Sequence, residues 1–168
     1  RAPETDATVE AVVKDAKGKD VARQTQTIHL CSGTDTPCTI PFSLANPVRW
    51  DGRKNPYLYT VEVKVSQQGV VVDSLSQTFG LRTVAISQKE GFELNGVPYP
   101  VYGVSRHQDM KDKGWALSAA DEDSDMACIK DIGATAIRMA HYPQSAHIHE
   151  VADREGFLVW DEVSLVNE

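Results

Sequence analysis

Short apolar runs with a two-residue rhythm mark about the first eighty residues of the chain. The clearest covers residues 57–65, where apolar positions alternate with aromatic or charged ones. Gln67-Gln68-Gly69 then turns the chain into a hairpin partner at residues 70–75. Further extended runs are expected at residues 8–13, 21–30, 39–44 and 77–82, and Pro41 places the third of these at an edge or a bend. About six or seven short strands with regular turns predict a β-sandwich of the immunoglobulin type.

The rhythm changes after Arg82. Three apolar runs, each followed by a polar cluster, are separated by stretches with helical spacing, and the runs cover residues 101–104, 134–137 and 157–160. Strand, polar cluster and helix, repeated, is how a (β/α) barrel carries a site on the C-terminal ends of its strands. About three of the eight units of such a barrel are present, so we expect the chain to be part of a larger enzyme.

The helical stretches have recognisable ends. Ser118, with Asp121 three residues later, resembles a capping box, and Gly133 ends that helix. The second helix is expected over residues 145–154. The expected fold is therefore an immunoglobulin-like β-sandwich over residues 1–82, followed by a partial α/β (TIM) barrel over residues 83–168. Between them, Asn95-Gly96 is a hairpin turn signal.

Composition and charge narrow the classes of partner. The chain is 41% hydrophobic and 24% charged, as expected of an ordinary globular chain, with a formal net charge of −7. An acidic balance argues against nucleic acid and against an anionic membrane surface as partners. No apolar run approaches the roughly 20 residues that a membrane helix needs.

Three cysteines give a weak indication of compartment. Cys31 and Cys38 flank a polar loop, so either they form a disulfide that suits an exported protein or they are two free thiols. Localisation stays open, with export slightly favoured over the cytoplasm. Cys128 is expected in the core, and no cysteine spacing resembles a zinc site.

The polar clusters after the strands are the candidate chemistry. Arg106 can clamp a carboxylate and His107 can donate to a sugar hydroxyl, the alternative being a surface pair. Arg138 at a strand end requires a carboxylate partner, either at the site or in a structural salt bridge. His141 lies further out in its loop and is expected to contact substrate.

The third cluster is Asp161-Glu162. Adjacent side chains on a strand point to opposite sides, so these two cannot both face a substrate as an acid/base pair. One of them is expected to support the polar core of the barrel, against Arg138. Trp160 is either a sugar-stacking platform or a packing residue, and Trp50 is expected in the core.

Taken together, these segments resemble glycoside hydrolase family 2, the β-galactosidase and β-glucuronidase group. The resemblance covers nearly the whole chain, in order and at the family's spacing. Its segments are Arg49-Trp50, Asn55-Pro56-Tyr57-Leu58-Tyr59, Phe79-Gly80-Leu81-Arg82-Thr83-Val84, Leu94-Asn95-Gly96, Gly103-Val104-Ser105-Arg106-His107, Arg138-Met139-Ala140-His141-Tyr142-Pro143 and Asp153-Arg154-Glu155-Gly156-Phe157-Leu158-Val159-Trp160-Asp161-Glu162.

The resemblance implies a retaining glycosidase, in which two glutamates about 5–5.5 Å apart act as acid/base and nucleophile. In the family both lie on later barrel strands, so no catalytic residue is expected in this chain. The pair Asn167-Glu168 looks like the family's acid/base pair but follows the third strand instead of the fourth. The resemblance also implies that His107 and His141 line the sugar subsite and that Arg138 supports the catalytic carboxylates.

The sequence departs from the family at several places. Ser105 replaces the usual Asn before the Arg-His pair, and Ala140 replaces the usual Ser before His-Tyr-Pro. Classical members bind magnesium through a Glu and a His where this chain has Val166 and Glu168, so we expect no magnesium site of that kind and no cofactor.

These observations lead to one prediction of function and two alternatives. We expect part of a retaining glycoside hydrolase that cleaves terminal β-galactosides, with the 168-residue chain inactive by itself. The alternatives are part of a β-glucuronidase and a non-catalytic carbohydrate-binding or scaffold module. The expected partner is a β-galactoside or related carbohydrate, and the full-length protein is expected to be an oligomer.

Overall fold

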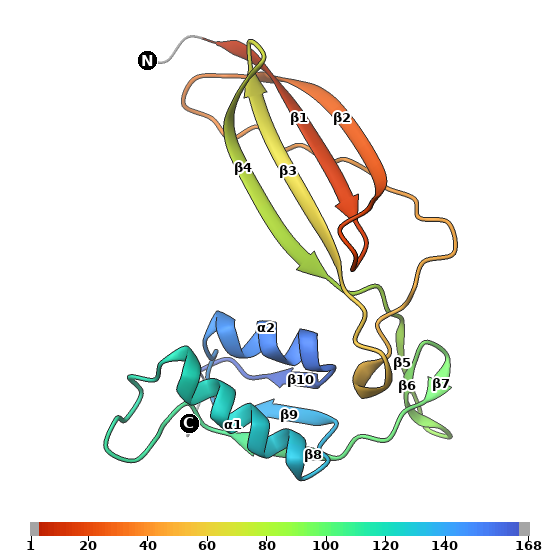
Figure 1. The fold of residues 1–168 in the computed structure, drawn as a ribbon, viewed down its shortest axis with the longest axis vertical. Coiled ribbons are helices and arrows are strands. Elements are labelled where there is room, and N and C mark those ends of the chain that lie inside the picture. Colours follow the sequence, from red (N-terminus) through yellow and green to blue (C-terminus); the bar gives the residue numbers. More distant parts are fainter. Residues whose placement is uncertain (1–3, 165–168) are drawn as a thin grey trace. The chain divides into compact units, whose positions relative to one another are not determined.

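The computed structural model describes residues 4–164, and the chain divides into two compact units. The first consists of Arg1–Val48 and Leu58–Phe79, and the second of Arg49–Tyr57 and Gly80–Glu168. Figure 1 shows the order of the helices and strands along the chain. The domain boundary between residues 82 and 83 stays a prediction.

The first unit contains a four-stranded antiparallel sheet in the order β2-β1-β3-β4 (Figure 1). The alternating apolar pattern places one set of β1 side chains in the core, including Ala7, Val9 and Ala11. Tyr59 is also buried and stacks on Phe79, with ring centroids 5.8 Å apart. The strands are β1 (Thr5–Lys14), β2 (Asp20–Leu30), β3 (Tyr59–Gln67) and β4 (Val70–Phe79).

The unit has fewer strands than the sequence pattern predicts. Residues 77–79 continue β4, and the expected strand at residues 39–44 is wrong, because this segment pairs with no neighbour. The two-residue rhythm is nevertheless real: Ile40, Phe42 and Leu44 are half-buried while the residues between them are exposed. Pro41 has no N–H to give to a ladder, so the segment stays extended without becoming a strand.

A small antiparallel sheet opens the second unit. It is formed by β5 (Val84–Ser87), β6 (Gly91–Leu94) and β7 (Val97–Pro98). Asn95 and Gly96 join the last two strands with φ of 56° and 80°, the left-handed conformations that a tight hairpin turn requires. The Asn95 side chain donates to the Trp50 carbonyl at 3.0 Å. Trp50 itself is buried, as predicted, near the short helix η1 (Gly52–Lys54).

The predicted βα units follow. Strands β8 (Gly103–Arg106), β9 (Ala136–Met139) and β10 (Leu158–Asp161) form a parallel sheet in the order β10-β9-β8. Helices α1 (Ala119–Asp131) and α2 (Ala146–Glu155) connect them. Each strand lies one or two residues later than its apolar run indicates, so the first residues of each polar cluster belong to the strand.

Both helices bury their apolar stripes against one face of this sheet. Ile137 and Met139 of the central strand lie in that core with Met126, Ile129 and Ile148. The opposite face carries no helix among the described residues, and Trp160 on it is 70% exposed. Parallel sheets are normally covered on both faces, so the exposure of this face is unusual for a parallel sheet.

The helix ends agree with their sequence signals. Ser118 and Asp121 form the full capping box at the start of α1, and Gly156 ends α2 in the left-handed conformation with φ 83°. The predicted burial of Cys128 is wrong, and Ile132 at the end of the helix is 67% exposed. The core stripe of α1 runs through its residues 122, 126 and 129, which points positions 128 and 132 away from the sheet.

The three cysteines are free in the structure. Cys31 is exposed and Cys38 is partly buried, so the structure favours the free-thiol alternative over a disulfide.

Candidate functional site

Three polar clusters meet at one edge of the parallel sheet, because the C-terminal ends of parallel strands lie side by side. The register pairs Ser105 with Arg138 and Arg138 with Trp160 across the three strands. These side chains point to the uncovered face, whereas the next residues along, Arg106, Met139 and Asp161, point to the helices.

The centre of the uncovered face is an ion-paired cluster of Arg138, His141 and Glu162. Arg138 Nε donates to Glu162 Oε1 at 2.6 Å, and His141 Nδ1 lies 2.9 Å from Glu162 Oε2. Arg138 Nη2 also lies 3.3 Å from His141 Nδ1. A single Nδ1 cannot both donate to the carboxylate and accept from the guanidinium, and the shorter contact favours donation to Glu162. The Nε2 atom of His141 is then left for another partner.

The electrostatics of this cluster suit binding better than proton transfer. The bond from Arg138 and then the bond from His141 hold the pKa of Glu162 below its usual 4.5. A general acid needs a raised pKa, so Glu162 is suited to holding its two neighbours in place and not to protonating a leaving group. His107 extends the cluster, since its ring meets that of His141 edge to face at 5.3 Å.

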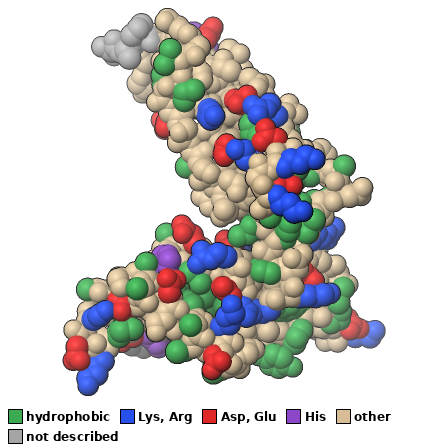
Figure 2. Space-filling model, in the orientation of Figure 1, with side chains coloured by type: hydrophobic (Ala, Val, Ile, Leu, Met, Phe, Trp, Pro, Cys, Tyr) green, Lys and Arg blue, Asp and Glu red, His purple; other side chains and the backbone are tan. Residues whose placement is uncertain are grey.

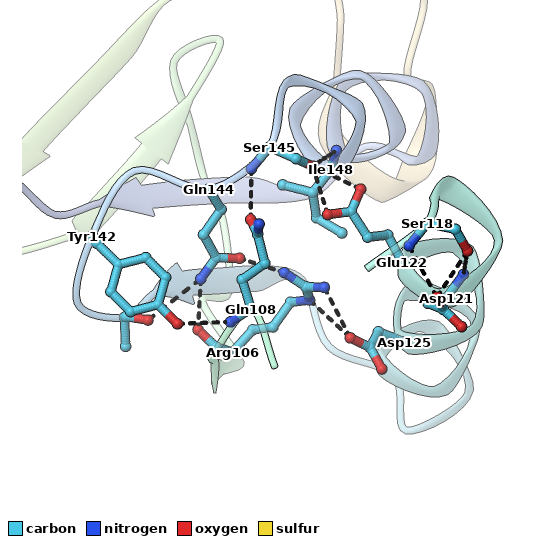
Figure 3. Close-up of polar contacts among 11 residues, drawn as sticks. Arg106, Gln108, Ser118, Asp121, Glu122, Asp125, Tyr142, Gln144, Ser145 and Ile148 are labelled. Atoms are coloured by element: carbon cyan, nitrogen blue, oxygen red, sulfur yellow. Dashed lines mark hydrogen bonds and ion pairs between the residues drawn. The ribbon is translucent and has the colours of Figure 1, made fainter. Parts of the chain in front are cut away.

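Exposure separates the predicted sugar-contacting residues. His107 is exposed and His141 is partly exposed, so both can reach a ligand on this face. Arg106 is only 5% exposed. It donates from Nε and Nη2 to Asp125 Oδ2 at 3.1 and 2.9 Å and from Nη1 to Gln144 Oε1 (Figure 3).

The predicted contact of Arg106 with substrate therefore has no support in this geometry. The reason is the strand itself: β8 continues to Arg106, and alternation turns this side chain toward α1 instead of the open face. Arg106 joins β8 to α1 and to the loop that carries His141.

Gln144 is the second anchor of that loop, which the sequence analysis missed. Its Nε2 donates to the Arg106 carbonyl at 2.8 Å, and the Ala140 backbone N–H donates to the same carbonyl at 3.0 Å. Gln108 acts similarly: its Oε1 accepts from the Ser145 N–H at 2.8 Å, and its own N–H donates to Tyr142 Oη at 3.0 Å (Figure 3). Each of these amides comes directly after a motif, and its residue type alone carries no sequence signal of this role.

Glu122 is a further buried polar residue beside the loop. It is 3% exposed, and its two oxygens lie 2.6 and 2.7 Å from Ser145 Oγ (Figure 3). Ser145 is the N-cap of α2 and also accepts from the Ile148 N–H at 3.2 Å. The negative charge therefore sits at the positive end of α2, where the helix dipole stabilises it.

Asp161 and Glu162 point to opposite sides of β10, as the alternation of a strand requires. Asp161 faces the helices, and its oxygens lie 3.0 and 3.1 Å from His149 Nε2. Asp161 is therefore tied to α2 and is not a member of the cluster on the open face. The support of the site by Arg138 and Glu162 stays a prediction, although the pair itself is seen.

Two hollows lie along this side of the second unit. One, of about 470 Å³, is lined by His141, its loop and residues 108 and 115. The other, of about 390 Å³, runs over the uncovered sheet between β8 and Trp160. Within residues 4–164, no group of three or more His, Cys, Asp and Glu side chains is arranged to hold a metal ion. Positions 166 and 168, which correspond to the magnesium ligands of classical family members, and the pair Asn167-Glu168 lie outside the described residues.

Comparison with known proteins decides the family. The description "Glycosyl hydrolases family 2" matches residues 1–82, and "Glycosyl hydrolases family 2, TIM barrel domain" matches residues 84–168. The chain belongs to glycosyl hydrolase family 2. The predicted fold class, an immunoglobulin-like unit followed by the start of a TIM barrel, is thereby confirmed, with no closed barrel in the described residues.

Family 2 relatives carry two different names. The chain is 32% identical to a β-glucuronidase of Bacteroides fragilis, over 99% of this chain and 24% of that protein. It is 30% identical to a β-galactosidase of Bacteroides ovatus, over 92% of this chain and 18% of that protein. The crystal structure of a putative β-galactosidase from Bacteroides fragilis superposes with a TM-score of 0.96 at 36% identity, over 99% of this chain and 25% of that one. The chain thus spans a quarter or less of the length of these relatives.

None of the helices in the described part of the chain is long and apolar enough to cross a membrane. On the face shown in Figure 2, basic and acidic side chains are interspersed and are not gathered by sign.

Proposed function

We propose that this chain supplies one side of the sugar-binding site of a retaining glycoside hydrolase that acts on terminal β-galactosides. The observation that carries the proposal is the cluster of Arg138, His141 and Glu162 on the uncovered strand ends, the place where (β/α) barrels carry their sites. Membership of family 2 supports the same reaction class.

The chain's own residues would bind and orient the sugar. Glu162 fixes the ring of His141, whose Nε2 can then hydrogen-bond a sugar hydroxyl, and His107 stands beside it. The acid/base and nucleophile of a retaining glycosidase would come from outside the described residues, because Glu162, the carboxylate of this cluster, is held ionised by Arg138. We therefore propose that the 168-residue chain alone has no turnover.

The charge of the cluster supports a neutral sugar over a uronate. A β-glucuronide brings a carboxylate, which needs an unengaged cation close to the ring. Arg138, the guanidinium of this cluster, already donates to Glu162, whose negative charge would repel a second carboxylate. A galactoside presents only hydroxyls, which His141 and His107 can satisfy.

The β-glucuronide alternative is kept for one reason: several family 2 relatives are named β-glucuronidase, among them one from Bacteroides fragilis and one from Streptococcus agalactiae. It requires a cation contributed by residues outside those described.

A panel of aryl β-D-glycosides tests both. Turnover of aryl galactoside, glucuronide and glucoside is measured with a chain continued beyond Glu168 far enough to close the barrel, and with the 168-residue chain as control. We expect galactoside turnover by the long chain alone. His141→Gln should lower kcat/KM about a hundredfold through loss of a sugar hydrogen bond that strengthens in the transition state.

The matched control is His147→Gln, since His147 lies on α2, paired with Asp123 and outside the cluster. Its kcat/KM should stay within about twofold. Preferential turnover of the glucuronide would replace the galactoside proposal. Absence of turnover on every sugar would instead favour the non-catalytic carbohydrate-binding module.

A further inference from the structure

The cavity of about 470 Å³ beside His141 is not used by the proposed sugar contacts. His141 belongs both to the ion-paired cluster and to the wall of this cavity. A ligand that reaches His141 on the open face can therefore extend directly into the cavity.

An aromatic surface forms part of its wall. Trp115 is 70% exposed, an unusual position for the largest apolar side chain, and its ring lies against that of Tyr142 at 5.2 Å with an interplanar angle of 37°. A hydrogen bond fixes the position of Tyr142, because its hydroxyl accepts from the backbone N–H of Gln108 at 3.0 Å (Figure 3). The two rings make one amphipathic platform next to His141.

The loop that presents Trp115 is held by its own contacts. Met110 and Gly114 exchange backbone bonds of 3.1 and 3.0 Å, which close the turn immediately before Trp115. Lys113 Nζ donates to Asp121 Oδ1 at 2.6 Å and so ties the turn to the first turn of α1. An exposed indole held by such contacts is a pre-organised surface and not a mobile tip.

Hydrogen-bonding groups surround the platform. The Gln108 oxygen must be the atom facing Ser145, because a backbone N–H donates to it, so the Gln108 amide nitrogen is oriented and has no hydrogen-bond partner within residues 4–164. The Nε2 atom of His141 is similarly left without a partner in that part of the chain. A cavity with an aromatic wall and a few fixed polar groups is the usual form of a small-molecule site.

We propose that Trp115 and Tyr142 form the subsite for a second pyranose ring, the one on the leaving-group side of the scissile bond. The C–H face of that ring would stack on Trp115, with its hydroxyls toward the Gln108 amide nitrogen and His141. This assignment rests on the proposed function, since it takes the terminal sugar to lie at His141. It makes the preferred substrate an oligosaccharide, with Trp115 setting the preference.

The test compares leaving groups in the barrel-completing chain. The kcat/KM for lactose is compared with that for methyl β-D-galactoside. Lactose has a glucose ring as its leaving group, whereas the leaving group of methyl galactoside is methanol, which has no ring. Trp115→Ala should lower kcat/KM for lactose at least tenfold, mainly through KM, and leave methyl galactoside within twofold. Trp115→Phe should recover most of the lactose activity, because a phenyl ring keeps a stacking face.

The control for loss of an exposed apolar side chain is Ile132→Ala, on the outer side of α1 at 67% exposure. It should leave kcat/KM unchanged for both substrates. An equal effect of Trp115→Ala on both substrates, or none on lactose, would overturn the subsite while leaving the glycosidase proposal standing.

Absence of glycoside turnover by the wild-type, barrel-completing chain would by itself reject the proposed function. The subsite is then decided by calorimetric titration with lactose. Binding that is lost in Trp115→Ala and kept in Ile132→Ala supports the platform, and an absence of binding overturns it.

Discussion

At the scale of single residues, Glu162 organises the uncovered face. It accepts from Arg138 at 2.6 Å and lies 2.9 Å from His141, so one carboxylate sets the orientation of both side chains. The choice of donor follows from it as well: with Nδ1 bonded to Glu162, only Nε2 of His141 is available to a ligand. A substitution of Glu162 should therefore change the orientation of both Arg138 and His141.

The first prediction concerns the titration of Glu162. Because the bond from Arg138 is the largest cause of its lowered pKa, Arg138→Gln should raise the pKa of Glu162 toward its ordinary 4.5. The stabilisation due to this pair is present above the ordinary pKa and is lost as the pH falls through the lowered one. Carboxyl ¹³C NMR of Glu162 in the two proteins measures the midpoints directly.

Arg154→Gln is the control for this titration, since Arg154 is exposed and forms no ion pair within residues 4–164. It should leave the Glu162 midpoint where it is. Equal midpoints in wild type and Arg138→Gln would show that the pair does not persist in solution.

Residue-level sequence reasoning succeeded where alternation was enough and failed where strand length mattered. Period-two geometry predicted that Asp161 and Glu162 point apart, and they do. The same geometry turns Arg106 inward, but only once β8 is known to continue to that residue; the apolar run alone ends at Val104. Gln144 could not be found, because the fold brings it to its partners, which are the Arg106 guanidinium and the backbone carbonyls that its Nε2 reaches.

At the scale of elements, the buried pair of Arg106 and Asp125 joins β8 to α1. The Arg106 side chain is 4% exposed and that of Asp125 is 29% exposed. Asp125→Asn leaves a guanidinium in the core without its charge partner. We expect a loss of about 2–3 kcal/mol in the free energy of unfolding of the second unit, below the full cost of a wholly buried pair because Asp125 keeps some contact with water.

Urea unfolding followed by circular dichroism measures this loss. The matched control is Asp123→Asn on the same helix; the Asp123 side chain is 55% exposed and, within residues 4–164, forms an ion pair with His147 alone. That change should cost less than about 0.5 kcal/mol, as expected for a surface pair. Similar losses in the two variants would mean that Arg106 finds another partner.

A second element-scale prediction concerns His149, which joins α2 to β10. Its Nδ1 lies 2.9 Å from the Ser145 carbonyl and its Nε2 lies 3.0 Å from Asp161, so both nitrogens donate in the protonated ring. Burial, the largest single influence, lowers the pKa of His149, but the Ser145 carbonyl and the Asp161 carboxylate, with the charge of Asp153, outweigh it and hold the pKa above 6.5.

A raised histidine pKa gives a stabilisation that is complete below the unfolded value of 6.5 and is lost as the pH rises through the folded value. The free energy of unfolding should therefore fall as the pH rises from 6.5 through the raised pKa of His149, and the fall should be smaller in His149→Gln. His147→Gln, which removes a histidine with no backbone bond of this kind, should keep the wild-type slope. Identical slopes of the free energy of unfolding against pH in wild type and His149→Gln would contradict the proposed contribution of the His149 contacts to Ser145 and Asp161.

Element boundaries were predicted well where one segment carries its own signals. The capping box of Ser118 and Asp121 starts α1 at the expected residue, and Gly156 ends α2. The predicted strand at residues 39–44 was wrong because a strand requires a partner strand, and no local sequence pattern shows whether such a partner exists. The three barrel strands were found in order, with their starts shifted by one or two residues.

At the scale of the whole molecule, the parallel sheet of the second unit is half-covered. Within residues 4–164, β8 and β10 each have one edge without a neighbouring strand, and one face has no helix. Large apolar side chains are exposed along this side: Val101 at 50% and Trp160 at 70%. Exposed apolar patches and unpaired strand edges together favour association.

The last prediction is that the 168-residue chain self-associates through this sheet. Light scattering over a range of concentrations should give a mass that rises above that of one chain, because association removes apolar surface from water and pairs free strand edges. Trp160→Ser should weaken the rise, whereas Ile132→Ser, a comparable loss at 67% exposure on the outer side of α1, should leave it unchanged. A single-chain mass at every concentration would mean that the open face is already covered. If the 168-residue chain associates while a chain continued past Glu168 stays monomeric, the continuation of the chain covers this face.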